Sequence, residues 1–180
     1  HPVKNLAMPT GGLISINHPD HKKFEKKLKS LRWCGISNRK LTSYDVTELG
    51  NNYYMNEFSA AIGLVQLKKI NRLTKMRQQI AKKYFNEIDI EDKMPFDRRC
   101  SYHLYWICVK NREYFRKKLY ENGIQTGTHY KPIHTMSMYK LKNNLPITNN
   151  VGDTIVSLPM HPNLTENDID KIISSTNKFS

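Results

Sequence analysis

The chain has 180 residues, a length that suits one large domain or two small ones and is sufficient to bury a core. It has 29 Lys and Arg residues and 16 Asp and Glu residues, which give a formal net charge of +13. The basic residues are spread over predicted helical stretches such as 22–29, and this distribution favours solvated helix faces over a nucleic-acid-binding block. No apolar run reaches the ~18 residues of a membrane span and the cysteines lack metal-ligand spacing, which argues against a transmembrane protein, a metal site and a disulfide scaffold.

The first residues suggest a processed chain with one lysine in an unusual place. The chain begins with His1 and Pro2 rather than Met, from which we expect a fragment or a processed product. Lys4 precedes the glycine pair at 11–12 and an apolar run at 13–17, which predicts a turn followed by a strand. A lysine held on a turn against a buried strand loses part of its hydration, and its amine can then attack a carbonyl. The alternative, which the local pattern alone favours, is an ordinary solvated surface lysine.

Helical periodicity dominates the next part of the chain. Asp20 is in position to cap a helix with apolar residues at three- and four-residue spacing, and Gly35 is expected to stop it. Residues 36–54 are predicted to form an irregular, polar connection, because they show no sustained period. The strongest helical signal covers 55–88, where a single rod would be about 50 Å long, so we expect a break or a kink within it.

From about residue 89 the pattern changes to that of a small α/β layer. A helix is predicted over 112–121, closed by Asn122 and Gly123, and a last helix begins at a capping box formed by Thr165 and Asp168. Extended segments are predicted at 101–109, 125–130 and 154–158. We therefore place a domain boundary between 88 and 89, within the polar stretch 85–95. The odd number of cysteines and the absence of a signal peptide predict a reduced, cytoplasmic protein.

A series of short segments also matches one known family in order and approximate spacing. These segments are 1–6, 11–12, 49–57, 60–67, 102–105, 123–124, 129–134, 158–162 and 164–165. Taken together they resemble the C-terminal half of the DegT/StrS-type sugar aminotransferases, which are pyridoxal-phosphate (PLP) enzymes. The resemblance implies an α/β fold, the C-terminal portion of an aspartate aminotransferase-like (fold type I) transferase. It also implies that residues 1–88 end the large PLP-binding domain and that 89–180 form the small C-terminal domain.

The resemblance assigns roles to individual residues. Lys4 matches the lysine that binds PLP covalently, and related dehydratases have histidine there, so lysine favours amino transfer. Asn52 matches an asparagine that reaches the PLP phosphate of the partner subunit in a homodimer, although Gly-Asn-Asn is also an ordinary turn sequence. His129, Tyr130 and His134 resemble positions near the sugar-nucleotide end of the site, and their alternative is a packed turn around a proline.

The sequence departs from the family pattern in two places. The family has Thr-Gly-Glu before its glycine pair, whereas this chain has Met8, Pro9 and Thr10, which bears on local geometry and on the substrate subgroup. Tyr54 stands where the family commonly has arginine, so one fixed positive charge is missing. His103 and His161 are interpreted as structural rather than functional.

The expected activity is transfer of an amino group, with glutamate as donor, to a keto-deoxyhexose linked to a nucleoside diphosphate, for amino-sugar biosynthesis. Relatives carry the aspartate on the pyridine nitrogen, the aromatic residue on the ring and most phosphate ligands in a preceding half, so we expect this chain alone to be inactive. Two alternatives remain: a non-catalytic remnant that keeps the dimer surface, and a basic nucleic-acid-binding module whose affinity falls steeply with salt. No membrane partner is expected.

Overall fold

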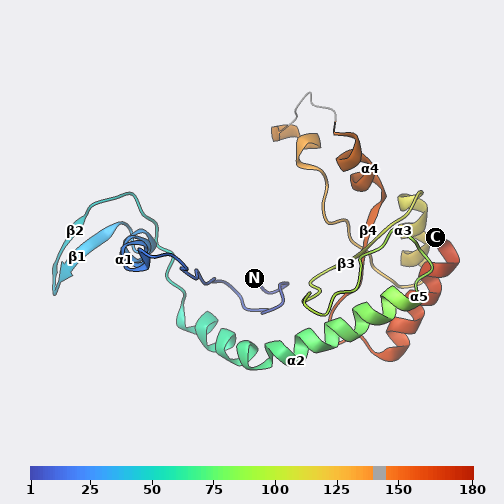
Figure 1. Cartoon of the computed structure of the whole chain (residues 1–180), viewed down its shortest axis with the longest axis horizontal. Coiled ribbons are helices and arrows are strands. Elements are labelled where there is room, and N and C mark those ends of the chain that lie inside the picture. Colours follow the sequence, from blue (N-terminus) through green and yellow to red (C-terminus); the bar gives the residue numbers. More distant parts are fainter. Residues whose placement is uncertain (140–144) are drawn as a thin grey trace. The chain divides into compact units, whose positions relative to one another are not determined.

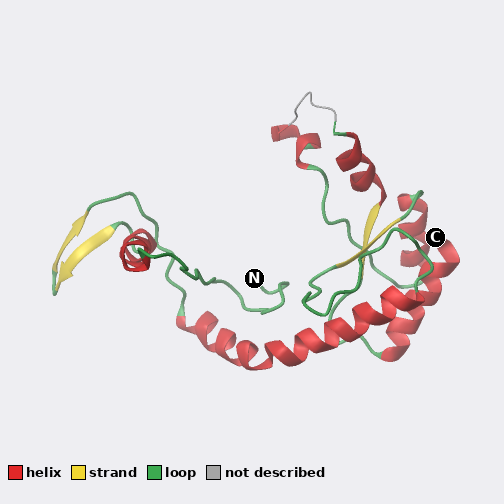
Figure 2. Ribbon diagram, viewed as in Figure 1, coloured by secondary structure: helices red, strands yellow, loops and turns green. Residues whose placement is uncertain are grey.

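The computed structural model describes residues 1–139 and 145–180, and these form two compact units, 1–70 and 71–180 (Figure 1). The helices are α1 (His21–Arg32), α2 (Glu57–Glu87), α3 (Arg112–Glu121), α4 (Pro146–Thr154) and α5 (Glu166–Phe179), with short 3-10 helices η1 (Ile133–Thr135) and η2 (Ser137–Tyr139). The strands are β1 (Ile36–Lys40), β2 (Ser43–Val46), β3 (Tyr105–Cys108) and β4 (Ile155–Leu158) (Figure 2). Helix α2 contributes residues to both units. None of the described helices has the length and apolar character that a membrane span requires.

Helix α1 starts and stops where predicted, although the Asp20 side chain makes no capping hydrogen bond. It begins directly after Asp20, and the Gly35 N–H donates to the Ser30 carbonyl at 3.0 Å just past its end. Gly35 has φ +74°, and a Cβ there would clash with the Glu48 carbonyl. Only glycine fits this close approach of two backbones.

Two predictions for the first unit are wrong. Residues 13–17 form no strand, and Leu13 and Ile14 are 90% and 70% exposed. An isolated strand leaves its backbone groups unpaired, and no described segment pairs with this one. Residues 36–54 are not wholly irregular, since 36–46 contain the antiparallel hairpin β1–β2, with Ile36 opposite Val46. Its strands are short and solvated, so they lack the apolar alternation by which a strand is recognised.

Helix α2 is continuous over 31 residues, so the predicted break is absent. No proline interrupts it, and the internal glycine, Gly63, faces the Met8 side chain, where a Cβ would lie 3.4 Å from the sulfur. Its N-terminus is closed by Asn56, whose side-chain oxygen accepts the Ser59 N–H at 2.8 Å. The first half of α2 exposes large apolar side chains, whereas its second half places Ile80 and Tyr84 in the core of the second unit.

The second unit is built on the antiparallel pair β3–β4, in which Tyr105 opposes Leu158 and Cys108 opposes Ile155. Helices α2, α3 and α5 and the loops between the elements supply the rest of its core, including the fully buried Phe115 and Leu119 of α3. Helix α3 has the predicted bounds, and β3 and β4 fall inside the predicted extended segments. The segment 125–130 contributes one bridge to the described residues, between Gly127 and Ser157. Helix α4 and the two 3-10 helices were not predicted. The predicted domain boundary between 88 and 89 stays a prediction, since the two compact units divide within α2.

The capping box of α5 is confirmed. The Thr165 hydroxyl accepts the Asp168 N–H at 3.2 Å, and Asp168 Oδ2 accepts the Thr165 N–H at 2.9 Å. Because two end groups of the helix are satisfied reciprocally, we expect Thr165→Ala to lower the free energy of unfolding by about 1 kcal/mol in urea denaturation. Ser174→Ala, at an exposed position later in the same helix, is the control and should have a smaller effect. Equal losses in the two variants would contradict the capping role.

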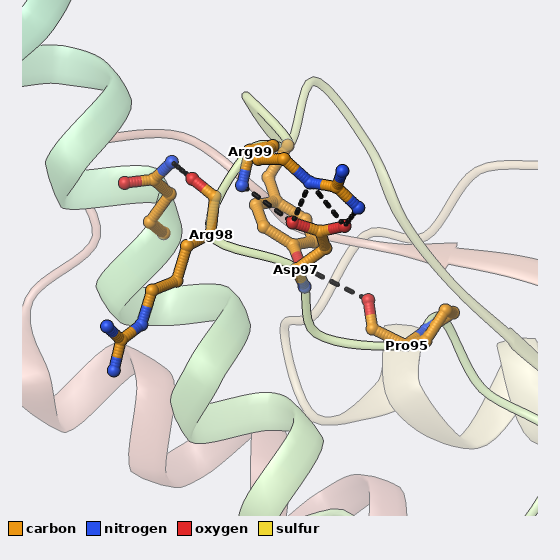
Figure 3. Close-up of polar contacts among 6 residues, drawn as sticks. Pro95, Asp97, Arg98 and Arg99 are labelled. Carbon is orange, nitrogen blue, oxygen red and sulfur yellow. Dashed lines mark hydrogen bonds and ion pairs between the residues drawn. The ribbon is translucent and has the colours of Figure 1, made fainter.

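The loop 95–102 is fastened to α2 by backbone-directed hydrogen bonds (Figure 3). Gln78 Nε2 donates to the carbonyls of Arg98 at 2.7 Å and Cys100 at 3.0 Å. The Tyr102 hydroxyl accepts the Asp97 N–H at 2.6 Å and donates to the Pro95 carbonyl at 3.1 Å. The loop therefore keeps its shape beside the helix.

Asp97 gives this loop a pH-dependent contact. The Arg99 side chain, and then its backbone N–H, hydrogen-bond the carboxylate and lower the pKa of Asp97 from 3.8 to about 2. A depressed folded-state pKa stabilises the fold above the unfolded value, and this contribution is lost as the pH falls from about 4 through about 2. We expect NMR titration of the Asp97 carboxyl to show this low midpoint. In Arg99→Ala the midpoint should rise towards 3.8, and an unchanged midpoint would contradict the assignment.

Candidate functional site

Lys4 lies in a compact turn at the start of the first unit. Its N–H donates to the His1 carbonyl at 3.1 Å, and its carbonyl accepts the Ala7 N–H at 2.8 Å. The residue is exposed, while Met8, four residues on, is buried. The turn therefore holds the lysine backbone and leaves the side chain accessible, but no buried strand lies against it as the sequence predicted.

The segment after Lys4 is anchored on the start of α2. The Thr10 and Ser59 hydroxyls lie 3.3 Å apart, and Ser59 is buried. Gly11 has φ +126°, and a Cβ at this position would clash with the end of the Met55 side chain. This glycine thus lets the segment pass directly over the residues that lead into α2.

Asn52 lies where the chain returns to the end of α1. It forms an isolated bridge with Trp33, and the neighbouring Tyr53 N–H donates to the Arg32 carbonyl at 2.9 Å. The Asn52 side-chain oxygen accepts the Tyr54 N–H at 3.2 Å, which is the turn interaction of the simpler interpretation. With the oxygen used in this way, the exposed NH₂ of the same amide remains as a donor.

Tyr54 is surrounded by groups of α1 and its C-terminus. The Arg32 guanidinium lies 4.6 Å above the centroid of its ring and reaches its hydroxyl at 3.5 Å. The Trp33 ring meets it edge-on at 5.9 Å. The positive charge of Arg32 thus lies against the Tyr54 ring, although position 54 itself is not an arginine.

The three substrate-site candidates of the second unit share the segment 129–134, but the two histidines have different anchors. His129 Nδ1 lies 2.9 Å from the Ser157 hydroxyl on β4, and the Tyr130 ring meets the His129 ring edge-on at 4.9 Å. His134 Nε2 lies 2.7 Å from the Asn149 side-chain oxygen on α4. Both histidines are half-buried, whereas Tyr130 is exposed.

A pocket of about 520 Å³ adjoins this segment. Arg112 and Lys131 bring positive charge to its lining, Asp153 is its acidic residue, and Asn149 is the residue that holds His134. The Arg112 guanidinium also donates to the Gly152 carbonyl, which fixes its position at the end of α4. The excess of positive charge and the amide and hydroxyl donors suit an anionic ligand with further oxygen atoms.

The structure therefore describes the predicted site residues in two groups. Lys4 and Asn52 belong to residues 1–70, and the segment 129–134 belongs to residues 71–180. Sequence reasoning missed Ser157 and Asn149, the partners of the two histidines. A lone polar residue inside the apolar run 155–158 was the available signal for Ser157, whereas nothing local marks Asn149.

Comparisons with known proteins give a consistent result. The family model of the DegT/DnrJ/EryC1/StrS aminotransferases matches residues 1–177. The uncharacterized protein MJ1066 of Methanocaldococcus jannaschii is 28% identical in an alignment of 201 residues. The alignment covers 98% of this chain and 51% of that protein.

Solved structures of aminotransferases are similar as well. A DegT DnrJ EryC1 StrS aminotransferase from Brucella abortus has a TM-score of 0.83 at 28% identity, over 99% of this chain and 49% of that one. Helicobacter pylori PseC, an aminotransferase involved in the biosynthesis of pseudoaminic acid, has a TM-score of 0.77 at 28% identity. The match covers 87% of this chain and 46% of PseC. The chain thus spans about half the length of these proteins. The expected α/β, fold type I aminotransferase architecture is confirmed.

Proposed function

The chain belongs to the DegT/DnrJ/EryC1/StrS aminotransferase family, and we propose that it is the C-terminal part of a PLP-dependent nucleotide-sugar aminotransferase. The enzyme transfers an amino group from glutamate to a keto-deoxyhexose carried on a nucleoside diphosphate, for amino-sugar biosynthesis. It acts as a cytoplasmic homodimer. The observation that carries this proposal is the family match over 1–177, which includes Lys4 and the segment 129–134.

The residues present fit PLP. Lys4 offers an exposed primary amine on a fixed turn, and Asn52 keeps an amide NH₂ that suits a phosphate oxygen. When bound, PLP supplies an electron sink for the charge that develops at the reacting carbon. Lys4 Nζ is the group that would hold the cofactor, and the same amine would move the proton at the carbon that bears the amino group. Asn52 would hold the phosphate of the cofactor in the partner subunit.

The second unit supplies the nucleotide-sugar end. Arg112, which is held by the Gly152 carbonyl, and Lys131 in the pocket beside 129–134 support binding of the diphosphate, because their positive charge exceeds the negative charge of Asp153 in the same lining. His129, Tyr130 and His134 contact the sugar nucleotide.

In this proposal, a segment that corresponds to the N-terminal half of the relatives completes the enzyme. The first half of α2 leaves Phe58, Leu64 and Leu67 exposed by 85%, 64% and 57%. Covering such a face stabilises an assembly by roughly 25 cal/mol per Å² of apolar surface. The chain alone therefore lacks both part of its packing and part of its cofactor site, and is inactive.

The test is amino transfer by the chain joined to, or co-expressed with, that preceding half. Glutamate and a panel of UDP-, dTDP- and GDP-linked keto sugars are supplied with PLP, and amino-sugar products are detected by mass spectrometry. The proposal predicts product from at least one substrate, and none from the chain alone. A dimer without product would favour the non-catalytic remnant, and salt-sensitive binding to nucleic acid in place of PLP would favour the basic module.

A further inference from the structure

Ser157 is a buried polar residue in an otherwise apolar strand. It lies in β4 between Val156 and Leu158, and only 4% of it is exposed. Its backbone N–H donates to the Gly127 carbonyl at 2.8 Å, and its carbonyl accepts the Gly127 N–H at 2.9 Å. The backbone of Ser157 is therefore fully used, and its hydroxyl is left to side-chain contacts.

The partner of that hydroxyl is the imidazole of His129. Ser157 Oγ lies 2.9 Å from His129 Nδ1, and no other hydrogen bond joins this hydroxyl to the described residues. Gly127 packs directly against the His129 imidazole, since a Cβ at this glycine would lie 2.6 Å from His129 Cε1 and 3.1 Å from Nδ1. The position of the ring is thus set by β4 and by the absence of a side chain at Gly127.

The direction of this hydrogen bond follows from the burial of Ser157. If His129 carried its proton on Nδ1 and donated it, the serine proton would be left in the strand without an acceptor. If Ser157 donates to Nδ1, both groups are satisfied, and the single proton of the neutral imidazole lies on Nε2. No hydrogen bond within the described residues uses Nε2, and this atom is not among their fully buried atoms without a partner, so it keeps some exposure on the half-buried ring.

We propose that Ser157 is a positioning residue that holds His129 as its Nε2–H form, so that His129 donates a hydrogen bond from Nε2 to an acceptor oxygen of the substrate. This inference rests on the proposed function for its ligand, an oxygen-rich nucleotide sugar. It assigns His129 the part of a donor rather than of a proton-accepting base. Gly127 provides the room that this ring position requires.

The tautomer is measured directly on this chain. Two-bond ¹H–¹⁵N correlation spectra of the ¹⁵N-labelled protein distinguish the two tautomers at a mildly alkaline pH, where imidazoles are neutral. The His129→Gln variant identifies the His129 signal among those of the seven histidines. We expect the Nε2–H pattern in the wild type, a mixture in Ser157→Ala, and restoration in Ser157→Thr. Ser175→Ala, at a buried serine of α5, should leave the His129 pattern unchanged. An Nδ1–H pattern in the wild type overturns the proposal without any variant, and so does an unchanged pattern in folded Ser157→Ala.

The ligand is tested on the extended protein. We expect a nucleotide-linked keto sugar to shift the His129 Nε2 signal, and Ser157→Ala to raise the KM for that substrate about fivefold while kcat stays similar, as for one weakened hydrogen bond. An Nε2 signal that does not respond to the sugar nucleotide overturns the substrate contact, even where the tautomer is as expected. Failure of the proposed function shows separately, as an absence of amino transfer by the wild-type extended protein.

Discussion

Replacing Lys4 by alanine is expected to abolish amino transfer in the extended protein of the proposed function. The side chain is accessible on a turn held by two backbone hydrogen bonds, so the change removes the amine and leaves the fold intact. Because the same amine holds PLP and moves the proton, we expect kcat to fall by at least about 10³-fold. Single-turnover assays with glutamate and the preferred keto sugar would measure the loss.

Lys22→Ala is the matched control, since Lys22 is an exposed lysine of α1. It should leave kcat within about twofold of the wild type, as expected for a solvated surface charge. Lys4→Arg keeps the charge but not the nucleophilic amine, so it should be as inactive as Lys4→Ala. Near-normal turnover in either Lys4 variant would contradict the catalytic role.

The largest effect on stability is expected at Phe115. This side chain of α3 is 1% exposed and belongs to the core formed with β3, β4 and α5. Truncation to alanine removes buried apolar surface and leaves a cavity, so Phe115→Ala should lower the free energy of unfolding of the second unit by about 3–5 kcal/mol. Urea denaturation followed by tyrosine and tryptophan fluorescence would measure it.

Tyr114→Ala is the control for this change. Tyr114 is the preceding aromatic residue of the same helix, but it is 49% exposed. Its loss should cost less than about 1 kcal/mol, because a surface substitution creates no cavity. Similar losses in the two variants would show that Phe115 does not belong to the core.

Local signals predicted the second unit best. Helix α3 has the expected bounds, and Gly123, at φ +76°, follows its end as predicted. The structure adds the cap at its start, where the Asn111 side chain accepts the Tyr114 N–H. The capping box of Thr165 and Asp168 fixes the start of α5 in the same way. These elements are determined within a few residues of sequence, so their chemistry can be read without knowledge of the rest of the chain.

Elements that depend on pairing were predicted less well. The apolar run 13–17 has the composition of a strand, but a strand also needs a neighbouring strand, and no described segment provides one. Strands β1 and β2 pair with one another through exposed residues, which carry no periodic apolar signal. Helix α2 continues where a break was expected, because the expectation rested on its length alone and no proline interrupts it.

In the candidate site, too, some residues are marked by the sequence and others only by tertiary contacts. Lys4, Asn52 and the segment 129–134 could be singled out because the family resemblance names their positions, and their roles remain predictions. Ser157 and Asn149 reach the two histidines from other elements, 28 and 15 residues further along the chain. Contacts of this kind depend on tertiary packing, so only the structure identifies them.

The most direct measurement is borohydride reduction in the presence of PLP, followed by peptide mass mapping, on the extended protein of the proposed function. The proposed function predicts a pyridoxyl group on Lys4 alone, in competition with the other lysines of a strongly basic chain. It also predicts that this labelling is lost in Lys4→Ala and weak in the chain by itself. Labelling scattered over surface lysines, or none on Lys4 in the extended protein, would contradict the assignment of this chain to PLP-dependent amino transfer.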